Sequence, residues 1–320
     1  MSRKGSGTVG NGLHGNDSPS RESFGPESHI PVLLDKVIEL MKPSPGKTLI
    51  DATGGPGNMS RALLDKSSPD GRVLTLDLDP NAIKAQESLL GEFGSRSVRR
   101  KTNFSEISSI AQSENFVPCD GILYDLGVSS PMLDVAGYGM AIRHADAELD
   151  MRFDPDNPVT ARDVVNNYTV EDLTRILRDM DEYRFARRIA NAIDRARRES
   201  QINTTGELAE IVEKAVPRRF HPRRMHVATR TFLAIRVEVN RERESLRKSL
   251  TDAAEVLSVG GVLIVICYSS FEDRIVKEVT REAKDRWEKI SKKAIRADEE
   301  EIERNPRSRS ARLRAYRKAA

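Results

Sequence analysis

The sequence is poor in cysteine, in long apolar runs and in net charge, and each shortage excludes a class of protein. Its two cysteines, Cys119 and Cys267, lie far apart without a CxxC pair, which argues against a zinc cluster or a disulfide framework and suits a reducing compartment. No apolar stretch approaches the length of a transmembrane helix. Because Lys and Arg number 52 against 49 Asp and Glu, any surface for nucleic acid must be local. We expect a cytoplasmic protein without a metal or a membrane partner.

Residues 1–28 contain almost no large apolar side chain and are rich in Gly, Ser and Asn, so we expect a disordered tail. The lack of a hydrophobic stretch excludes a secretory signal. The first sixteen residues carry Arg3 and Lys4 but no acid. An organellar transit peptide, and with it a mitochondrial or chloroplast location, is therefore the alternative.

A glycine-rich turn at 54–60 (GGPGNMS) follows an apolar run but lacks the features that bind phosphates. No Walker lysine follows it, and Ser60 stands where a dinucleotide site would need its third glycine. Roughly 20 residues further on, Asp77 ends a second apolar run and can accept hydrogen bonds from ribose hydroxyls. Asp79 precedes Pro80 and suits a helix cap instead. The combination predicts S-adenosylmethionine as cofactor, with a purely structural turn as the alternative.

Apolar periodicity predicts an α/β fold interrupted by a helical insertion. Strands are expected at 48–53, 72–78, about 97–103, 121–126 and 261–268, and helices at 31–41, about 58–66 and 80–93. Strands that alternate with helices at this spacing predict a parallel sheet with right-handed crossovers. The pattern is purely helical from about 160 to 216, and one long helix is expected from about 228 to 257. Two segments, about 292–296 and 312–317, are expected to finish the sheet as a hairpin.

Several longer segments are more specific than the cofactor turn. They are HIPVLL at 29–34, DLGVSSP at 125–131, LDMR at 149–152, ATRTF at 228–232, EDRIVK at 272–277 and NPRSRSARLR at 305–314. In order and spacing, over about residues 29–318, they resemble the RsmH (MraW) family of 16S ribosomal RNA cytosine-N4 methyltransferases.

The resemblance implies a Rossmann-like class I SAM-dependent methyltransferase sheet formed by residues 29–133 and 228–320, with an inserted all-helical RNA-recognition domain at 134–227. It also implies methylation of the exocyclic amine of a cytidine in the decoding centre, and the small ribosomal subunit as partner. A homodimer is left open. The expected cofactor contacts are Gly55, Gly57, Asn58, Met59, Asp77, Phe104, Asp125 and Met132.

A cytosine amine is a poor nucleophile, because its lone pair is delocalised into the ring. It must be held in place beside acceptors for its protons, and a strand-end carboxylate before a Ser-Ser-Pro turn suits this task. The expected catalytic residues are Asp125, Ser129, Ser130, Pro131 and Tyr268. Tyr268 is expected to stack on a flipped-out base and Tyr124 to pack in the core. The alternative role for Asp125 is a helix or turn cap.

Cations mixed with an aromatic residue mark a candidate surface for RNA between two helical segments. The expected RNA-binding residues are Arg218, Arg219, Arg223, Arg224, His226, Arg230, Arg307 and Arg309. Such cations contact phosphates, and a solvated charge run is the alternative. Arg236 either contacts RNA or pairs with Glu238 or Glu242.

Four departures from the family pattern cluster near the expected cofactor pocket. Relatives typically carry histidine at 59 and 269 and glutamine at 132 and 233. This chain has Met59, Ser269, Met132 and Leu233, and each lost hydrogen bond costs on the order of 1 kcal/mol. Two alternatives therefore stay open: a catalytically silent paralogue that acts in small-subunit assembly, and a methyltransferase for another RNA or for DNA.

Overall fold

The computed structural model describes residues 30–181 and 184–320. The predictions made for the tail, residues 1–28, lie outside the described residues. The α/β class is confirmed by one seven-stranded sheet with the order β3-β2-β1-β4-β5-β7-β6. Its strands are β1 (Thr48–Asp51), β2 (Arg72–Asp77), β3 (Ser97–Lys101), β4 (Cys119–Asp125), β5 (Leu257–Cys267), β6 (Trp287–Lys289) and β7 (Arg312–Lys318).

Strands β1 to β5 pair in parallel, and β7 pairs antiparallel with both β5 and β6. The chain places β2 and β3 on one side of β1, and β4 and β5 on the other. The strand order thus reverses between β1 and β4, and open α/β sheets bind ligands at the carboxyl ends of their strands at such a point.

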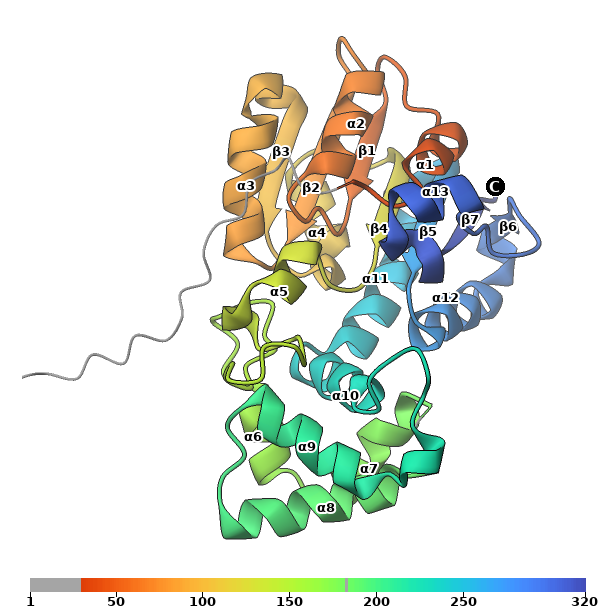
Figure 1. Cartoon of the computed structure of the whole chain (residues 1–320). Helices are drawn as coiled ribbons and strands as arrows, with labels where there is room; N and C mark the ends of the chain where they lie inside the picture. The colour runs from red at the N-terminus through yellow and green to blue at the C-terminus, as the bar shows by residue number, and fades with distance from the viewer. Residues whose placement is uncertain (1–29, 182–183) are drawn as a thin grey trace, which may run out of the picture.

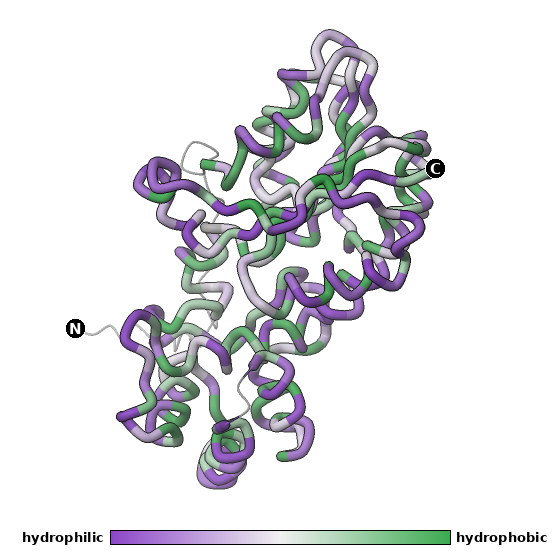
Figure 2. The backbone as a smooth tube through the Cα atoms, turned by 90° about the vertical axis from the view of Figure 1, so that its right-hand side faces the viewer, coloured by the Kyte–Doolittle hydropathy of each residue, from purple (hydrophilic) through white to green (hydrophobic). Residues whose placement is uncertain are grey.

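Alternate residues of the central strands enter two separate apolar cores, one on each face of the sheet. In β4, Ile122 and Tyr124 join the core that also holds helix residue Leu250, whereas Leu123 between them joins the core that holds Leu63. This is the two-residue periodicity of a strand buried on both faces. In Figure 2, stretches coloured as hydrophobic lie toward the middle of the upper part of the molecule.

Helices cover both faces. On one face lie α1 (Leu34–Met41), α2 (Asn58–Lys66) and α3 (Pro80–Leu90), and on the other α4 (Ile107–Ser113), α11 (Glu242–Val256) and α12 (Ser270–Glu282). The short helix α13 (Glu299–Arg304) precedes the turn that leads into β7. Sheet and helices form the upper part of the molecule in Figure 1.

A helical insertion between β4 and β5 contains α6 (Ala161–Asn167), α7 (Val170–Asp179), α8 (Ala186–Glu199) and α9 (Thr205–Ala215), which form the lower part of Figure 1. The short α5 (Ser130–Asp134) leads from β4 into the insertion, and α10 (Thr229–Val239) leads back from it. Capping boxes begin α6 at Thr160 and α9 at Thr204, which satisfies their first backbone donors. Helix α8 packs on α7 and α9, and α10 packs on α6, α7 and α11.

The single long helix expected from 228 to 257 is wrong, because the chain breaks between α10 and α11. Arg241 adopts a left-handed backbone with φ of 49°. The side chain of Asn240 accepts a hydrogen bond from Phe153 N at 2.8 Å and donates one to Met151 O at 2.8 Å. These two bonds connect the break to the loop that contains Met151 and Phe153. The helical periodicity of the sequence does not indicate such long-range bonds.

The expected terminal hairpin is confirmed for one of its two segments. The second segment is β7, but its hairpin partner is β6 at Trp287–Lys289 rather than 292–296. In the expected segment, Ile295 forms an isolated bridge with Leu313. Trp287 is buried against Tyr316. This contact stabilises the pairing of the earlier segment, β6, with β7.

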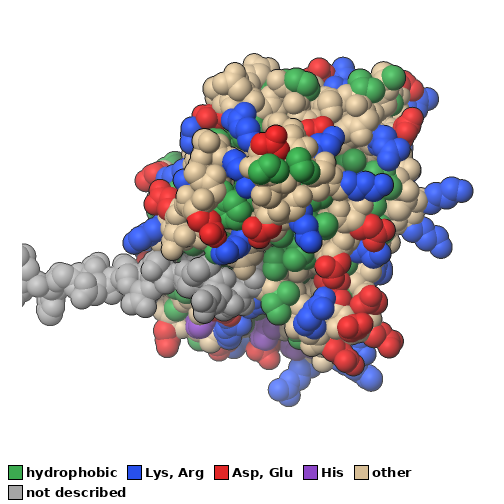
Figure 3. Space-filling view, turned by 90° about the horizontal axis from the view of Figure 1, so that it is seen from above, with side chains coloured by type: hydrophobic (Ala, Val, Ile, Leu, Met, Phe, Trp, Pro, Cys, Tyr) green, Lys and Arg blue, Asp and Glu red, His purple; other side chains and the backbone are tan. Residues whose placement is uncertain are grey.

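The surface is mixed in charge. Over the face seen in Figure 3, Lys and Arg side chains are interspersed with Asp and Glu. Within residues 30–181 and 184–320, no helix is long and apolar enough to cross a membrane, and no cluster of His, Cys, Asp and Glu could hold a metal ion.

Candidate active site

Three aspartates stand at the carboxyl ends of neighbouring parallel strands. Asp51 ends β1, Asp77 ends β2 and Asp125 ends β4. Parallel strands end at one edge of the sheet, so the three carboxyl groups gather where the strand order reverses. Asp77 and Asp125 border a cavity of about 590 Å³ at this edge, and Asp51 is buried behind it, where it accepts from Ser60 Oγ at 2.7 Å.

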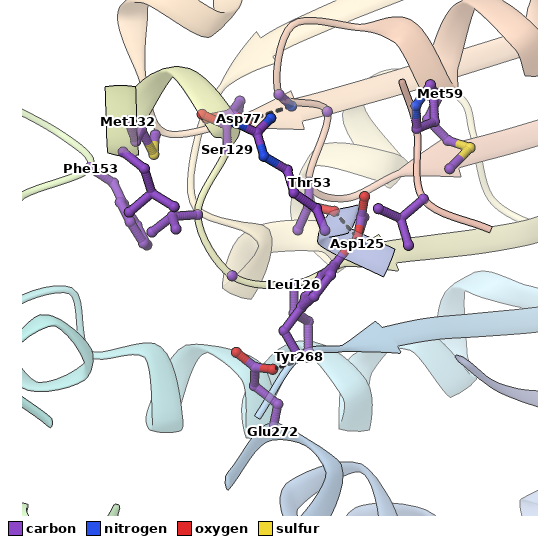
Figure 4. Close-up of a pocket in the computed structure, with 18 of the residues that line it drawn as sticks. Thr53, Met59, Asp77, Asp125, Leu126, Ser129, Met132, Phe153, Tyr268 and Glu272 are labelled. Atoms are coloured by element: carbon purple, nitrogen blue, oxygen red, sulfur yellow. Dashed lines mark hydrogen bonds between the residues drawn. The ribbon is translucent and has the colours of Figure 1, made fainter. Parts of the chain in front are cut away.

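The cavity brings together most of the predicted cofactor and catalytic residues. Figure 4 shows Asp77 and Ser129 above, Thr53 and Asp125 in the centre, and Tyr268 with Glu272 below. Its walls include the predicted residues Gly55, Asn58, Met59, Asp77, Phe104, Asp125, Ser129, Met132 and Tyr268. Gly57 instead occupies the N-cap position of α2, Ser130 is the first residue of α5, and the buried Pro131 lies in its first turn.

The glycine turn is held by hydrogen bonds to the end of β2 and to α3. Gly55, with φ of 51°, donates its N–H to Asp77 Oδ2 at 2.7 Å and accepts at its carbonyl from Gln86 Nε2 at 2.8 Å. Gly57 has φ of 103°, a conformation that glycine adopts without strain. Gln86, which lies on α3 and bonds the turn from that helix, could not be predicted from the sequence.

Asp79 is the helix cap that the sequence predicted. Its side chain accepts from Asn81 N at 2.9 Å at the start of α3, and it also accepts from the Tyr138 hydroxyl at 2.6 Å. Asp77 borders the cavity, and it accepts from Asp79 N at 2.8 Å in addition to Gly55 N. Burial raises the pKa of Asp77 to about 7, despite these two bonds.

Asp125 is bound by two residues of neighbouring strands. Its N–H donates to Thr53 Oγ1 at 2.6 Å, and its Oδ1 accepts from the Tyr268 hydroxyl at 2.7 Å. Burial raises the pKa of Asp125 to about 7. The alternative role as a cap is not what the described residues show, since the donor to this carboxylate is a side-chain hydroxyl. Tyr124 is fully buried and bonds Ser249 Oγ at 2.6 Å, so its predicted core role is confirmed.

Ser129 carries an unsatisfied hydroxyl on the cavity wall. It occupies the N-cap position of α5, yet its side chain makes no capping bond. Its Oγ is buried and has no hydrogen-bond partner within the described part of the chain. A buried polar atom without a partner is rare in native structures, so this hydroxyl is suited to a bound ligand.

A buried charge group closes the floor of the cavity. Arg236 pairs with Glu242 at 2.7 and 2.9 Å, which confirms one of its two expected pairings, and it lies 4.0 Å from Glu272. Glu272 Oε2 accepts from Tyr268 N at 2.7 Å and from Ser269 N at 2.9 Å. Burial raises the pKa of Glu272 while Arg236 lowers it. The group thereby fixes the backbone at the end of β5.

The four residues that depart from the family pattern make contacts of their own in the structure, and Leu233 packs against the same apolar core as Met132. Met59 and Met132 are each 6% exposed and pack in the two apolar cores while bordering the cavity. Ser269 is the N-cap of α12, where it forms a capping box with Glu272. The side chains that replace polar residues therefore have apolar or capping contacts of their own.

The predicted RNA-binding residues fall into two groups. Of the eight, all among the described residues, Arg307 and Arg309 border the cavity, in the turn of residues 306–310 before β7. Arg307 also lies 3.3 Å from Asp134 of α5. The others lie between α9 and the start of α10, where the 3-10 turn Arg218–Phe220 packs its ring on Phe185. Arg230 Nη1 reaches Asp181 O at 3.5 Å.

The buried carboxyl groups predict that the ligand-free protein is more stable at about pH 5.5 than at about pH 8. Burial raises the pKa of Asp51 to about 6 and those of Asp77 and Asp125 to about 7. In the unfolded chain the pKa of each of these groups is about 4. Between these values the folded chain binds more protons than the unfolded chain, so its free energy of unfolding falls as pH rises. Thermal unfolding midpoints at both pH values test this, and equal midpoints would contradict it.

Comparisons by sequence with known proteins identify the family of this chain. A family model described as MraW methylase family matches residues 27–319. "Ribosomal RNA small subunit methyltransferase H" of Symbiobacterium thermophilum is 41% identical over 308 residues, which cover 90% of this chain and 95% of that protein. The protein of the same name from Mycolicibacterium smegmatis is 42% identical over 314 residues, covering 91% and 84%. A solved rRNA methylase from Streptococcus thermophilus aligns over 92% of this chain and 100% of its own at 10% identity, with a TM-score of 0.45. From its sequence matches, the chain belongs to the MraW methylase family.

Proposed function

We propose that the protein is an S-adenosylmethionine-dependent methyltransferase that methylates N4 of a cytidine in the decoding centre of small-subunit ribosomal RNA. The observation that carries the proposal is the placement of two carboxyl groups, Asp77 and Asp125, on one cavity beside the glycine turn. One acid suits a ribose and the other a nitrogen that must lose a proton. The names of the curated relatives support ribosomal RNA as the substrate.

The residues on the cavity fit the cofactor. Asp77 would accept from the ribose hydroxyls, because each carboxylate oxygen keeps a lone pair beyond its backbone bond. Leu78 and Phe104 offer apolar surface for adenine, and Gly55 lets the backbone approach the ligand. When bound, S-adenosylmethionine supplies an electrophilic methyl group, whose bond to sulfur breaks as the attacking lone pair forms the new bond.

Asp125 and Ser129 are the groups that would orient the target amine. Asp125 has one carboxylate oxygen bonded to Tyr268, which leaves Oδ2 to accept from an amine N–H. Ser129 Oγ can fill its empty hydrogen-bonding capacity with a second polar atom of the base. Holding the nucleophile in this way can supply several kcal/mol of the barrier. Asp125 then accepts the proton that the amine loses, in the manner of a general base.

The RNA would meet the cavity from the side of the cationic residues. Arg307 and Arg309 stand on the cavity wall and suit the phosphates that flank the target nucleotide. The cationic segment at 218–226 and the helical insertion at 134–227 would bind more distant parts of the RNA. Phosphate contacts of this kind place the substrate without reading its sequence.

Replacing Arg309 with alanine is expected to weaken RNA binding and to lower the dependence of affinity on salt, because one phosphate contact releases about one counterion. Arg309 is exposed on the cavity wall, and no ion pair holds it within the described residues. Binding of a small-subunit RNA fragment at several salt concentrations measures both effects. Arg304→Ala is the matched control, since Arg304 is also exposed but does not border the cavity in the described structure. If the dependence of affinity on salt were unchanged in Arg309→Ala, the proposed contact of Arg309 with a phosphate would be wrong.

Mapping N4-methylcytidine in small-subunit RNA with and without the protein tests the proposed reaction. Loss of the modification without the protein, and its return with purified protein and S-adenosylmethionine, is the expected result. Firm RNA binding without cofactor binding would instead favour a silent assembly factor. Turnover on a non-ribosomal substrate would favour methylation of another RNA or of DNA.

A further inference from the structure

The Tyr268 hydroxyl is the side-chain donor to Asp125 among the described residues. It lies 2.7 Å from Asp125 Oδ1. The backbone of Tyr268 is held by the bond from Tyr268 N to Glu272 Oε2 at 2.7 Å. Its ring lies beside Gly127. A Cβ at Gly127 would lie 3.5 Å from Tyr268 Cδ2. The hydroxyl is therefore placed by the fold and does not depend on a ligand.

We infer that Tyr268 is a positioning residue that favours the ionised form of Asp125 and holds its Oδ1, so that Oδ2 is left for the target amine. The inference rests on the proposed function, in which Asp125 accepts from that amine. It differs from the role in base stacking expected from the sequence, since it assigns the work to the hydroxyl and not to the ring.

The charges that face Asp125 act against its ionised form. Asp51 and Glu272 are the acids whose negative charges act on it. Arg236, one of the arginines that border the same cavity, is bonded to Glu242 and lies 4.0 Å from Glu272, so its charge is already shared by two carboxylates. Burial and both acids disfavour ionisation of Asp125, whereas the bond from Tyr268 favours it.

The same pair determines which group takes the proton. In the transfer, the amine nitrogen forms a bond to the methyl carbon, the carbon–sulfur bond breaks, and its electrons stay on sulfur. The amine then carries one proton too many, which passes to Asp125 Oδ2 and on to water. Tyr268 cannot be the acceptor, because burial and the charge of Asp125 raise its pKa well above the usual range. It remains a donor throughout.

Tyr268→Phe removes the hydroxyl and keeps the ring, and Tyr124→Phe is the matched control. Tyr124 also has a buried hydrogen-bonded hydroxyl, but its partner is Ser249 in the core. The first measurement is a 13C NMR titration of the Asp125 carboxyl carbon in the full chain, with Asp125→Asn to assign the signal. The second is the pH dependence of single-turnover methylation of small-subunit RNA at saturating S-adenosylmethionine.

In Tyr268→Phe the Asp125 midpoint, and with it the acidic limb of the rate profile, is expected to move up by about one pH unit. Tyr124→Phe should move neither. A fluorinated tyrosine at 268 is a stronger hydrogen-bond donor and should move the Asp125 midpoint down. It replaces Tyr268→Phe as the test if that variant does not fold. An unmoved midpoint in Tyr268→Phe overturns the inference even if methylation is slower. If the Asp125 titration midpoint moves but the native protein does not methylate RNA, the effect of Tyr268 on Asp125 is supported and the proposed function is wrong.

Discussion

Asp125→Asn is expected to lower the rate of methyl transfer by about 10²-fold to 10⁴-fold, the usual contribution of a positioned base. An amide oxygen can still accept a hydrogen bond from the amine, but it cannot take the proton. The variant should also unfold at a higher temperature at about pH 8, since burial raises the pKa of Asp125 to about 7 and its ionised form costs stability. Single-turnover methylation and thermal unfolding of the same preparation measure both effects.

The matched control is Asp120→Asn, at the other end of the same strand. Asp120 pairs with Lys47 at 2.6 Å and accepts from Thr48 N at 2.8 Å, away from the cavity. Its replacement should leave the rate of methyl transfer unchanged. If Asp125→Asn kept the native rate, another group would have to accept the proton. A fall in rate together with lost cofactor binding would point to a displaced loop instead.

Asp77→Asn is expected to weaken S-adenosylmethionine binding by about 10-fold to 100-fold, the loss typical for hydrogen bonds to a charged acceptor. The side chain keeps its size, but one of its oxygens becomes a donor that faces the N–H of Gly55 or Asp79. Titration calorimetry with S-adenosylmethionine and with S-adenosylhomocysteine measures the loss. Both ligands carry the ribose, so both should weaken equally.

Asp70→Asn is the control for this second variant. Asp70 lies just before the other end of β2 and accepts from the exposed Gly46 N at 2.8 Å. Its replacement should leave cofactor affinity unchanged. An Asp77→Asn variant with native affinity for both ligands would show that the ribose is held elsewhere on the cavity.

The sheet could be predicted from the sequence because its strands are buried on both faces and read as short apolar runs. The ends of two of these runs also hold Asp77 and Asp125, which were predicted as site residues and border one cavity in the structure. The broken helix could not be predicted in this way. Its break depends on the buried bonds of Asn240 to Phe153 and Met151, which are 87 and 89 residues away in the chain. Helical periodicity depends on residues a few positions apart, so it does not indicate a hydrogen-bond partner so far away in the chain.

The site was predictable where local sequence makes it, and less so where side chains meet across elements. The glycine turn, Asp77 and the Asp79 cap follow from neighbouring residues. Gln86 and Thr53, which brace the turn and Asp125, gave no such signal. The loss of a histidine at 269 suggested a weakened pocket, but the serine there caps α12. A substitution can remove one hydrogen bond and create another with its own backbone.

The position of α11 has a consequence for how freely the family can vary. The chain leaves β4 at the carboxyl edge of the sheet, and it must return to the opposite edge before β5 can run parallel to β4. Helix α11, packed on α4, α12 and β5, makes that return. Everything from the end of β4 to the start of α11 is therefore a detour with no part in ordering the strands. None of the described residues that border the cavity lies in α6, α7, α8 or α9, and extra length there costs little in loop entropy, so these four helices can be lengthened or trimmed while the cavity keeps its shape.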